Sequence, residues 1–259
     1  MHTTWKGSLN FGFVAIPVAL YGATDEKKVS FNQLHTDCGG QVKQPKYCEV
    51  CERNIPNNEI MKGYPIDPKH GKFVPVTWED LDSLKLPSSR TLQVLMMVDI
   101  DEVDPRFFKK SYFLTPETAV GRPSFLLFQT LMEERGLVAI SKIMMKEREQ
   151  LCCIRAFGGL MLVQTMFWHE ELREYAGFAV EKLPIDVREL EMAGKLLDTL
   201  TMDTCDLSFY EDKYEGALEE LIYAKLEGKT IEAPVEQESK LDSASLAEQL
   251  IASLNAITC

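Results

Sequence analysis

The chain has 259 residues, of which 45% are hydrophobic and 26% are charged, and its formal net charge is −12. This composition is typical of a globular protein and excludes a disordered one. No apolar run approaches about 20 residues, so the sequence indicates neither a membrane span nor a secretory signal. The acidity is concentrated at one end, because residues 1–180 have a balance of −1 and residues 181–259 a balance of −11. A near-neutral body can still present a basic surface, so a polyanionic ligand is not excluded.

The first predicted element is a β-rich segment from Trp5 to Tyr21. Its apolar residues Val14, Ile16, Val18 and Leu20 alternate along the chain, which is the period of a strand. Pro17 interrupts this run, and because proline cannot donate to a ladder it predicts an edge or a bulge.

A pattern of possible metal ligands follows at residues 35–51. His35 and Cys38 form an H-x2-C pair, and Cys48 and Cys51 form a C-x2-C pair. Two such pairs match a tetrahedral structural zinc site, with His35 as the weakest ligand, and so predict a small zinc-ribbon-like knuckle. The alternatives are ordinary reduced cysteines in a hairpin, or a redox pair that lacks its usual βα context. The odd total of seven cysteines fits reduced thiols better than a disulfide framework.

Short elements are expected over the next hundred residues. Thr77 followed by Asp80 is typical of a helix start, and Gly136 is typical of a residue just beyond a helix end. The expected elements are short strands and a helical turn within 59–89, strands at 91–98 and 107–114, and a helix at 123–135.

A β-meander is predicted from three apolar runs at 138–145, 151–156 and 160–166. Residues 147–150 are interpreted as a polar turn, and Gly158 with Gly159 as a second turn. Lys142 and Lys146 share one face by the period of two, and Arg148 and Arg155 add positive charge nearby. This basic face is either a solvated surface or a wall that faces phosphates. Lys43 and Lys46, between the two ligand pairs of the knuckle, could likewise be presented to a phosphate.

The last third changes to a helical period. Two helices are predicted at about 185–200 and 211–227, and a helical hairpin of this kind must pack on the barrel, on a second copy of the chain, or on both. Residues 231–240 have the composition of a linker. A final short helix then carries an apolar stripe and either docks a partner or packs back on the body; its residues are Leu246, Leu250, Ile251 and Leu254.

The sequence lacks the motifs of the common enzyme classes. We find no P-loop, GxGxxG, GxSxG or HExxH pattern, and the four histidines have no partner pattern that suggests nucleophilic catalysis. The residues therefore favour a binding protein over an enzyme.

Several collinear blocks resemble prokaryotic Ku proteins over residues 3 to 230. The opening block is Trp5-Lys6-Gly7-Ser8-Leu9-Asn10-Phe11-Gly12, followed by Ile16-Pro17-Val18 and Leu20-Tyr21. Further blocks are Phe31 to His35, Lys62-Gly63-Tyr64, Ile100 to Pro105, Arg148 to Arg155, and Tyr223 to Lys229. The combination is specific, whereas each block alone is a weak signal.

The resemblance implies an α+β, β-rich fold with a central β-barrel at 1–180, a helical arm at 181–230, and a linker with a short helix at 231–259. It implies a homodimeric ring that threads onto ends of double-stranded DNA, independently of sequence, in double-strand break repair by non-homologous end joining. Such a protein would be cytoplasmic and nucleoid-associated, and would recruit a multifunctional DNA repair ligase through residues 241–259. Lys142, Lys146, Arg148 and Arg155 match the basic hairpin of the family.

The sequence also departs from the family pattern. Phe167 stands where the family often has a basic residue, and the chain ends in an acidic linker where many members have a Lys-rich tail. One alternative function is a lyase that acts on abasic or 5′-deoxyribose-phosphate ends through a lysine Schiff base. Another is a zinc-dependent module that binds RNA or protein.

Overall fold

The computed structural model describes residues 2–25, 29–83, 90–145, 148–178, 180–181, 183–229, 249–250 and 253. The chain divides into two compact units, residues 1–174 and 175–259. Within the described ranges, four α-helices of six residues or more are present, and none is long and apolar enough to cross a membrane.

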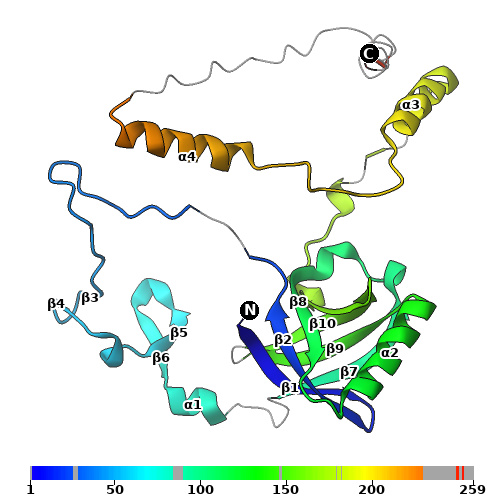
Figure 1. Cartoon of the computed structure of the whole chain (residues 1–259). Coiled ribbons are helices and arrows are strands. Elements are labelled where there is room, and N and C mark those ends of the chain that lie inside the picture. Colours follow the sequence, from blue (N-terminus) through cyan, green and yellow to red (C-terminus); the bar gives the residue numbers. More distant parts are fainter. Residues whose placement is uncertain are drawn as a thin grey trace. The chain divides into compact units, whose positions relative to one another are not determined.

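The first unit is built on a closed barrel of seven strands in the order β1-β2-β8-β11-β10-β9-β7 (Figure 1). All neighbours pair antiparallel except β1 and β7, which are parallel. The strands are β1 Thr3–Phe11, β2 Val14–Gly22, β7 Thr91–Asp99, β8 Phe108–Pro116, β9 Leu137–Met145, β10 Arg148–Phe157 and β11 Leu160–Met166. The predicted central β-barrel is therefore confirmed.

The barrel closes where β1 meets β7. Ser8 donates its backbone N–H to the carbonyl of Arg90 at 2.9 Å, and the ladder continues with Leu9 opposite Leu92. A Cβ atom at Gly7 would overlap the Arg90 carbonyl and the Trp5 ring. Glycine is thus required at this position because two backbones and an aromatic ring approach it closely.

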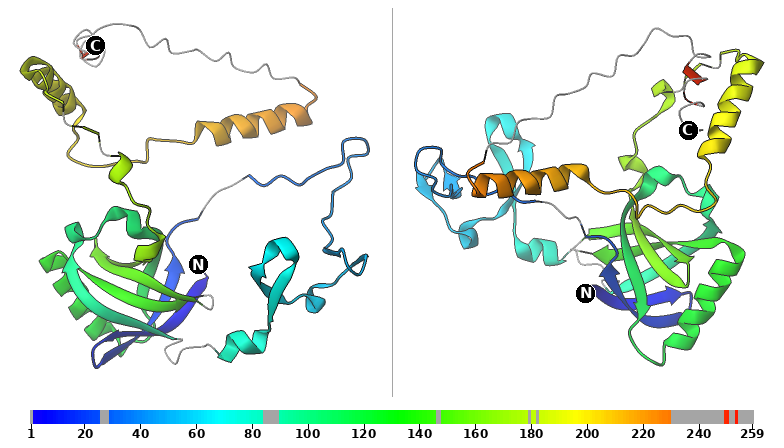
Figure 2. Two further views of the ribbon diagram at one scale, coloured as in Figure 1. Left: turned by 180° about the vertical axis from the view of Figure 1, so that it is seen from behind. Right: turned by 45° about the horizontal axis from the view of Figure 1, so that its top comes forward.

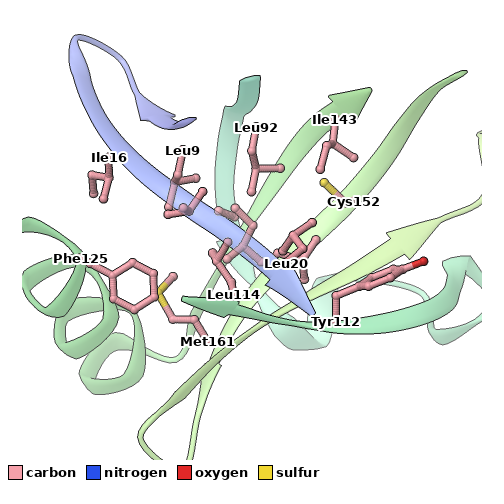
Figure 3. Packing of buried hydrophobic residues seen from close by; sticks show 14 of the residues in the cluster. Leu9, Ile16, Leu20, Leu92, Tyr112, Leu114, Phe125, Ile143, Cys152 and Met161 are labelled. Carbon is pink, nitrogen blue, oxygen red and sulfur yellow. The ribbon is translucent and has the colours of Figure 1, made fainter. Parts of the chain in front are cut away.

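The interior of the barrel is one hydrophobic cluster. Ile16, Val18 and Leu20 of β2 all point inward, as their alternation predicted. The α2 helix, Arg122–Arg135, adds Phe125 and Met132 to this cluster, and Figure 3 shows the Phe125 ring next to Met161. Figure 2 shows α2 lying against the curved strands, so the helix contributes to the same core as the barrel.

A second, smaller cluster lies on the outer face of the barrel. Val138, Cys153 and Met166 are buried there beneath the segment that joins β7 to β8. That segment contains the two 3-10 turns η3 Ile100–Glu102 and η4 Pro105–Phe107, and Ile100 and Val103 pack on the cluster. Burial raises the pKa of the Cys153 thiol to about 11, so this thiol stays protonated at neutral pH.

A long insert leaves the barrel after β2 and returns at β7. It contains the two-residue strands β3 Tyr47–Cys48 and β4 Arg53–Asn54, the hairpin β5 Lys62–Asp67 and β6 Lys72–Val76, and the helix α1 Trp78–Ser83. The turns η1 Asn57–Glu59 and η2 Pro68–His70 complete it. Thr77 caps α1 as predicted, because its hydroxyl accepts from the Asp80 N–H while the Asp80 carboxylate accepts from the Thr77 N–H.

The second unit includes the helices α3 Val187–Leu200 and α4 Lys213–Leu226. The carboxylate of Asp186 accepts from the Arg188 N–H at the start of α3, and that of Asp212 accepts from the Tyr214 N–H at the start of α4. These caps satisfy amides that a helix start otherwise leaves unpaired. Of the final predicted helix, only 249–250 and 253 are described, and they are helical. The linker at 231–240 lies outside the described residues.

Two local expectations hold only in part. At Pro17 the ladder pairs β2 with β1 alone, as at an edge, but β2 as a whole is not an edge strand because it pairs with β8 from Val18 onward. Pro17 lies one residue before the β8 ladder begins at Val18, so its missing N–H leaves no gap in that ladder. The polar turn expected at residues 147–150 is also shorter than predicted, because Arg148 already begins β10.

Candidate nucleic-acid interface

The meander β9–β10–β11 separates its side chains cleanly between two faces. Ile143 and Met145 of β9 belong to the interior cluster, whereas Ile140 packs on the outer cluster. Lys142 lies opposite Leu151 of β10, which is also on the outer cluster, so Lys142 points outward. The predicted alternation of Lys142 with Ile143 is therefore confirmed.

Lys142 is held by two neighbours. Its ammonium lies 3.2 Å from a carboxylate oxygen of Glu149 and 5.5 Å from the centre of the Trp168 ring. Glu149 neutralises part of the lysine charge, and the ring attracts the cation through its π face. Lys142 is thus a positioned cation at the outer surface.

The segment after β11 holds a second cation, Lys109, at the start of β8. The Lys109 ammonium lies 3.9 Å from the centre of the Phe167 ring and 3.1 Å from a carboxylate oxygen of Glu171. That carboxylate also accepts from the Trp168 N–H at 2.7 Å. The hydrogen bond from the Trp168 N–H, and to a smaller extent the one from Lys109, lowers the pKa of Glu171. This carboxyl therefore stays ionised at a lower pH than an ordinary glutamate. Phe167 therefore holds a neighbouring lysine at the position where the family pattern suggests a basic residue.

Lys142 and Lys109 are linked through the barrel wall. Lys142 lies opposite Leu151, Leu151 opposite Met166, and Met166 opposite Phe108, which precedes Lys109. This row crosses β9, β10, β11 and β8.

The two arginines of β10 face opposite ways. Arg155 lies opposite Val138 and points outward, with its guanidinium 5.4 Å from the centre of the Phe157 ring. Arg148 is exposed but lies opposite Met145, so the strand directs it to the other face. Lys146 lies outside the described residues. We name three cations the cationic wall: Lys142 and Arg155, which point outward, and Lys109, which Phe167 and Glu171 hold in place.

The sequence did not single out Lys109 or Trp168 as site residues. Each is brought to the wall by contacts between segments that are far apart in the chain. The only available signal was the composition of the Phe167–Trp168–His169–Glu170–Glu171 segment, in which two aromatic rings precede two carboxylates.

In the knuckle, the structure forms each predicted ligand pair separately. His35 Nδ1 lies 3.2 Å from Cys38 Sγ. Gly39 follows Cys38 with φ 66°, at the point where the chain turns back. Cys48 and Cys51 are hydrogen-bonded to each other, and the Cys51 N–H lowers the pKa of the Cys48 thiol. Lys43 and Lys46 are exposed in the irregular segment between the two pairs.

The four predicted ligands do not form one site. Among the residues that the structure describes, no three His, Cys, Asp or Glu side chains are grouped so that they could hold a metal ion. The expected zinc ribbon is thus present only as two separate pairs, and a tetrahedral site would require the pairs to approach each other.

Comparison with known proteins places this barrel in a family. The model of the Ku family, described as the Ku70/Ku80 beta-barrel domain, matches residues 10–192. The chain is 36% identical over 258 residues to the non-homologous end joining protein Ku of Symbiobacterium thermophilum. The aligned region covers 99% of this chain and 63% of that protein. The chain is 33% identical over 260 residues to the protein of the same name from Archaeoglobus fulgidus, covering 99% of this chain and 100% of that one.

The chain belongs to the Ku family of DNA repair by non-homologous end joining. The chain spans less than two thirds of the Symbiobacterium protein, but the whole length of the Archaeoglobus protein. Membership of this family confirms the prediction of a binding protein rather than an enzyme.

The cationic wall yields a graded prediction for DNA binding. Removal of one protein–phosphate ion pair reduces the slope of log affinity against log salt by about 0.9. We expect about this change for Arg155→Ala, because no described carboxylate lies within ion-pair distance of Arg155. We expect a smaller change for Lys142→Ala, because Glu149 already neutralises part of that charge. Salt titrations of binding to linear duplex would measure both slopes.

Two further variants serve as controls for this prediction. Arg122→Ala removes an exposed arginine from the start of α2, outside the wall, and should leave the slope unchanged. Glu149→Gln should steepen the slope by freeing Lys142. If a folded Arg155→Ala protein keeps the parental slope, the wall faces bulk solvent and does not contact phosphate.

Proposed function

We propose that this protein binds ends of double-stranded DNA as a homodimer and recruits a DNA repair ligase for non-homologous end joining. The observation that carries this proposal is a barrel within the Ku-family match at residues 10–192, with three cations held in place on it. Positioned lysine and arginine side chains suit phosphates, which carry no direct sequence information. Binding would therefore depend on an end and not on a base sequence, and would place the protein on the nucleoid.

The second unit supports the dimer. α3 presents an apolar stripe, yet none of its residues is buried, and Leu190, Leu197 and Leu200 are all more than half exposed. An amphipathic helix of this kind is stabilised mainly by packing of its apolar face. A second copy of the chain would cover the stripe, and two copies related by a two-fold axis could enclose a duplex that one copy could not.

End dependence can be measured with one duplex in two topologies. We expect two chains to bind a short linear duplex, and no comparable binding to a covalently closed circle of the same sequence, because a ring can load only at an end. Opening the circle with a single blunt cut should restore binding. Tight binding to the closed circle would exclude threading, and preference for RNA duplexes would favour the alternative RNA-binding module.

We further propose that residues 241–259 dock the ligase. The support is the apolar stripe of Leu246, Leu250, Ile251 and Leu254 behind a polar linker in the sequence. Deletion of residues 241–259 should leave end binding intact and abolish the stimulation of ligation by a multifunctional repair ligase. Leu250→Ala, made in the full-length chain, should by itself weaken the stimulation of ligation. A fall in thermal stability that matches the loss of stimulation would show instead that the segment packs on the body.

We also propose one structural zinc ion per chain, bound by His35, Cys38, Cys48 and Cys51. The support is the donor set of three thiols and one imidazole, already arranged in two pairs. Protein purified without added metal should contain about one zinc per chain. Cys48→Ser plus Cys51→Ser should remove it, whereas Cys205→Ser, an exposed cysteine outside the pairs, should not. Equal zinc content in the double variant would disprove this site.

A further inference from the structure

The β5–β6 hairpin is basic in a strongly acidic chain. Residues 61–78 contain Lys62, Lys69 and Lys72 against Asp67 alone, a balance of +2, whereas the whole chain has −12. His70 at the turn is hydrogen-bonded to Asp67 at 2.7 Å, so the one carboxylate of the hairpin is already occupied.

The same hairpin exposes two aromatic rings on one face. Tyr64 is 68% exposed and Trp78, at the start of α1, is 60% exposed. Tyr64 lies opposite Val74 and Lys62 lies opposite Val76, so Tyr64 and Lys62 share a face. The Lys62 ammonium lies 4.6 Å from the centre of the Trp78 ring, which places Trp78 beside the same face.

The opposite face is arranged differently. Phe73 packs over Gly63, where a Cβ atom would lie 3.2 Å from the Phe73 Cβ. This cross-strand contact gives Phe73 a structural role within the hairpin. Tyr64 and Trp78 are more exposed than Phe73, and Trp78 lies beside Lys62.

We propose that Tyr64, Trp78 and Lys62, here named the ring platform, bind unpaired bases of single-stranded overhangs on DNA ends. The proposal rests on the proposed end-binding function and adds a ligand to it. Aromatic rings accept any base by stacking, and an adjacent lysine attracts the phosphate that follows. Lys69 and Lys72, on the turn side of the hairpin, extend the positive charge along the proposed path of the DNA overhang.

The charge of the hairpin favours a nucleic acid over a protein partner. An apolar peptide would require neighbours that tolerate burial, whereas Lys62 is exposed beside the Trp78 ring, and Lys69 and Lys72 are exposed on the turn side of the hairpin. An isolated two-stranded hairpin is also marginally stable in water, so a ligand that covers its exposed rings would stabilise it.

The test compares three DNA ends on the same duplex: a blunt end, an overhang of about six thymidines, and an overhang of equal length built from abasic spacers. The spacers keep the phosphates but remove the bases. We expect the thymidine overhang to bind more tightly than the other two by roughly five- to hundredfold, the range for stacking of one base.

Variants assign this gain to the platform. Trp78→Ala and Tyr64→Ala should each remove most of the gain and leave blunt-end affinity unchanged, whereas Trp78→Phe should retain part of it. Phe13→Ala removes a still more exposed aromatic from the β1–β2 turn and should change neither affinity. Circular dichroism of each variant checks that it is folded.

The outcomes separate the two proposals. Absence of blunt-end binding by the unaltered protein would reject the proposed function itself. Blunt-end binding without a gain from thymidines, or an equal gain from abasic spacers, would reject base stacking alone. An equal loss on blunt and overhanging ends in Trp78→Ala would show that the hairpin supports general binding, and would also overturn the ring platform.

Discussion

The parallel pairing of β1 with β7 is the constraint on which the rest of the structure depends. It is the one parallel contact in the barrel, and it closes the sheet around the interior cluster. Parallel neighbours cannot be joined by a tight turn. In the chain, β1 and β7 are accordingly separated by β2 and by the long insert that carries the knuckle and the ring platform. Gly7 permits this closure because its missing side chain leaves room for the Arg90 carbonyl.

The cationic wall is built from cations that already have neighbours. Lys142 is shared between Glu149 and Trp168, and Lys109 between Glu171 and Phe167. An arriving phosphate would exchange with a carboxylate at these two positions rather than meet a free charge. Such an exchange would limit the gain in binding free energy at each position. It also explains how a chain with a net charge of −12 can present a polyanion site.

Much of the barrel could be predicted because its strands show the period of two. The alternation of Ile16, Val18 and Leu20 indicated the inward face of β2, and paired glycines at 158–159 marked the turn before β11. The candidate site was less predictable. The early start of β10 turns Arg148 to the face opposite Lys142, and a shift of one residue in a strand reverses the direction of a side chain. Lys109 and Trp168 join the wall through long-range contacts that no local pattern encodes.

The segment from Ile100 to Pro105 illustrates how a short motif can serve packing and turn geometry together. The Asp99 carboxylate accepts from the Asp101 N–H, and the Asp104 carboxylate accepts from the Arg106 N–H. These bonds fix two tight turns, and the turns carry Ile100 and Val103 onto the outer cluster. The sequence shows the acidic residues, but their purpose is visible only once the barrel wall beneath them is known.

The insert is joined to the barrel at both of its ends. The length of the insert can therefore change without a change in the pairing register of the barrel strands. The entropy of closing a loop grows only with the logarithm of its length, so doubling the insert would cost about 0.6 kcal/mol. A longer or shorter insert would thus leave the β1–β7 ladder and the interior cluster as they are. The fold therefore allows the reach of the knuckle and of the β5–β6 hairpin to change during evolution at little thermodynamic cost to the barrel.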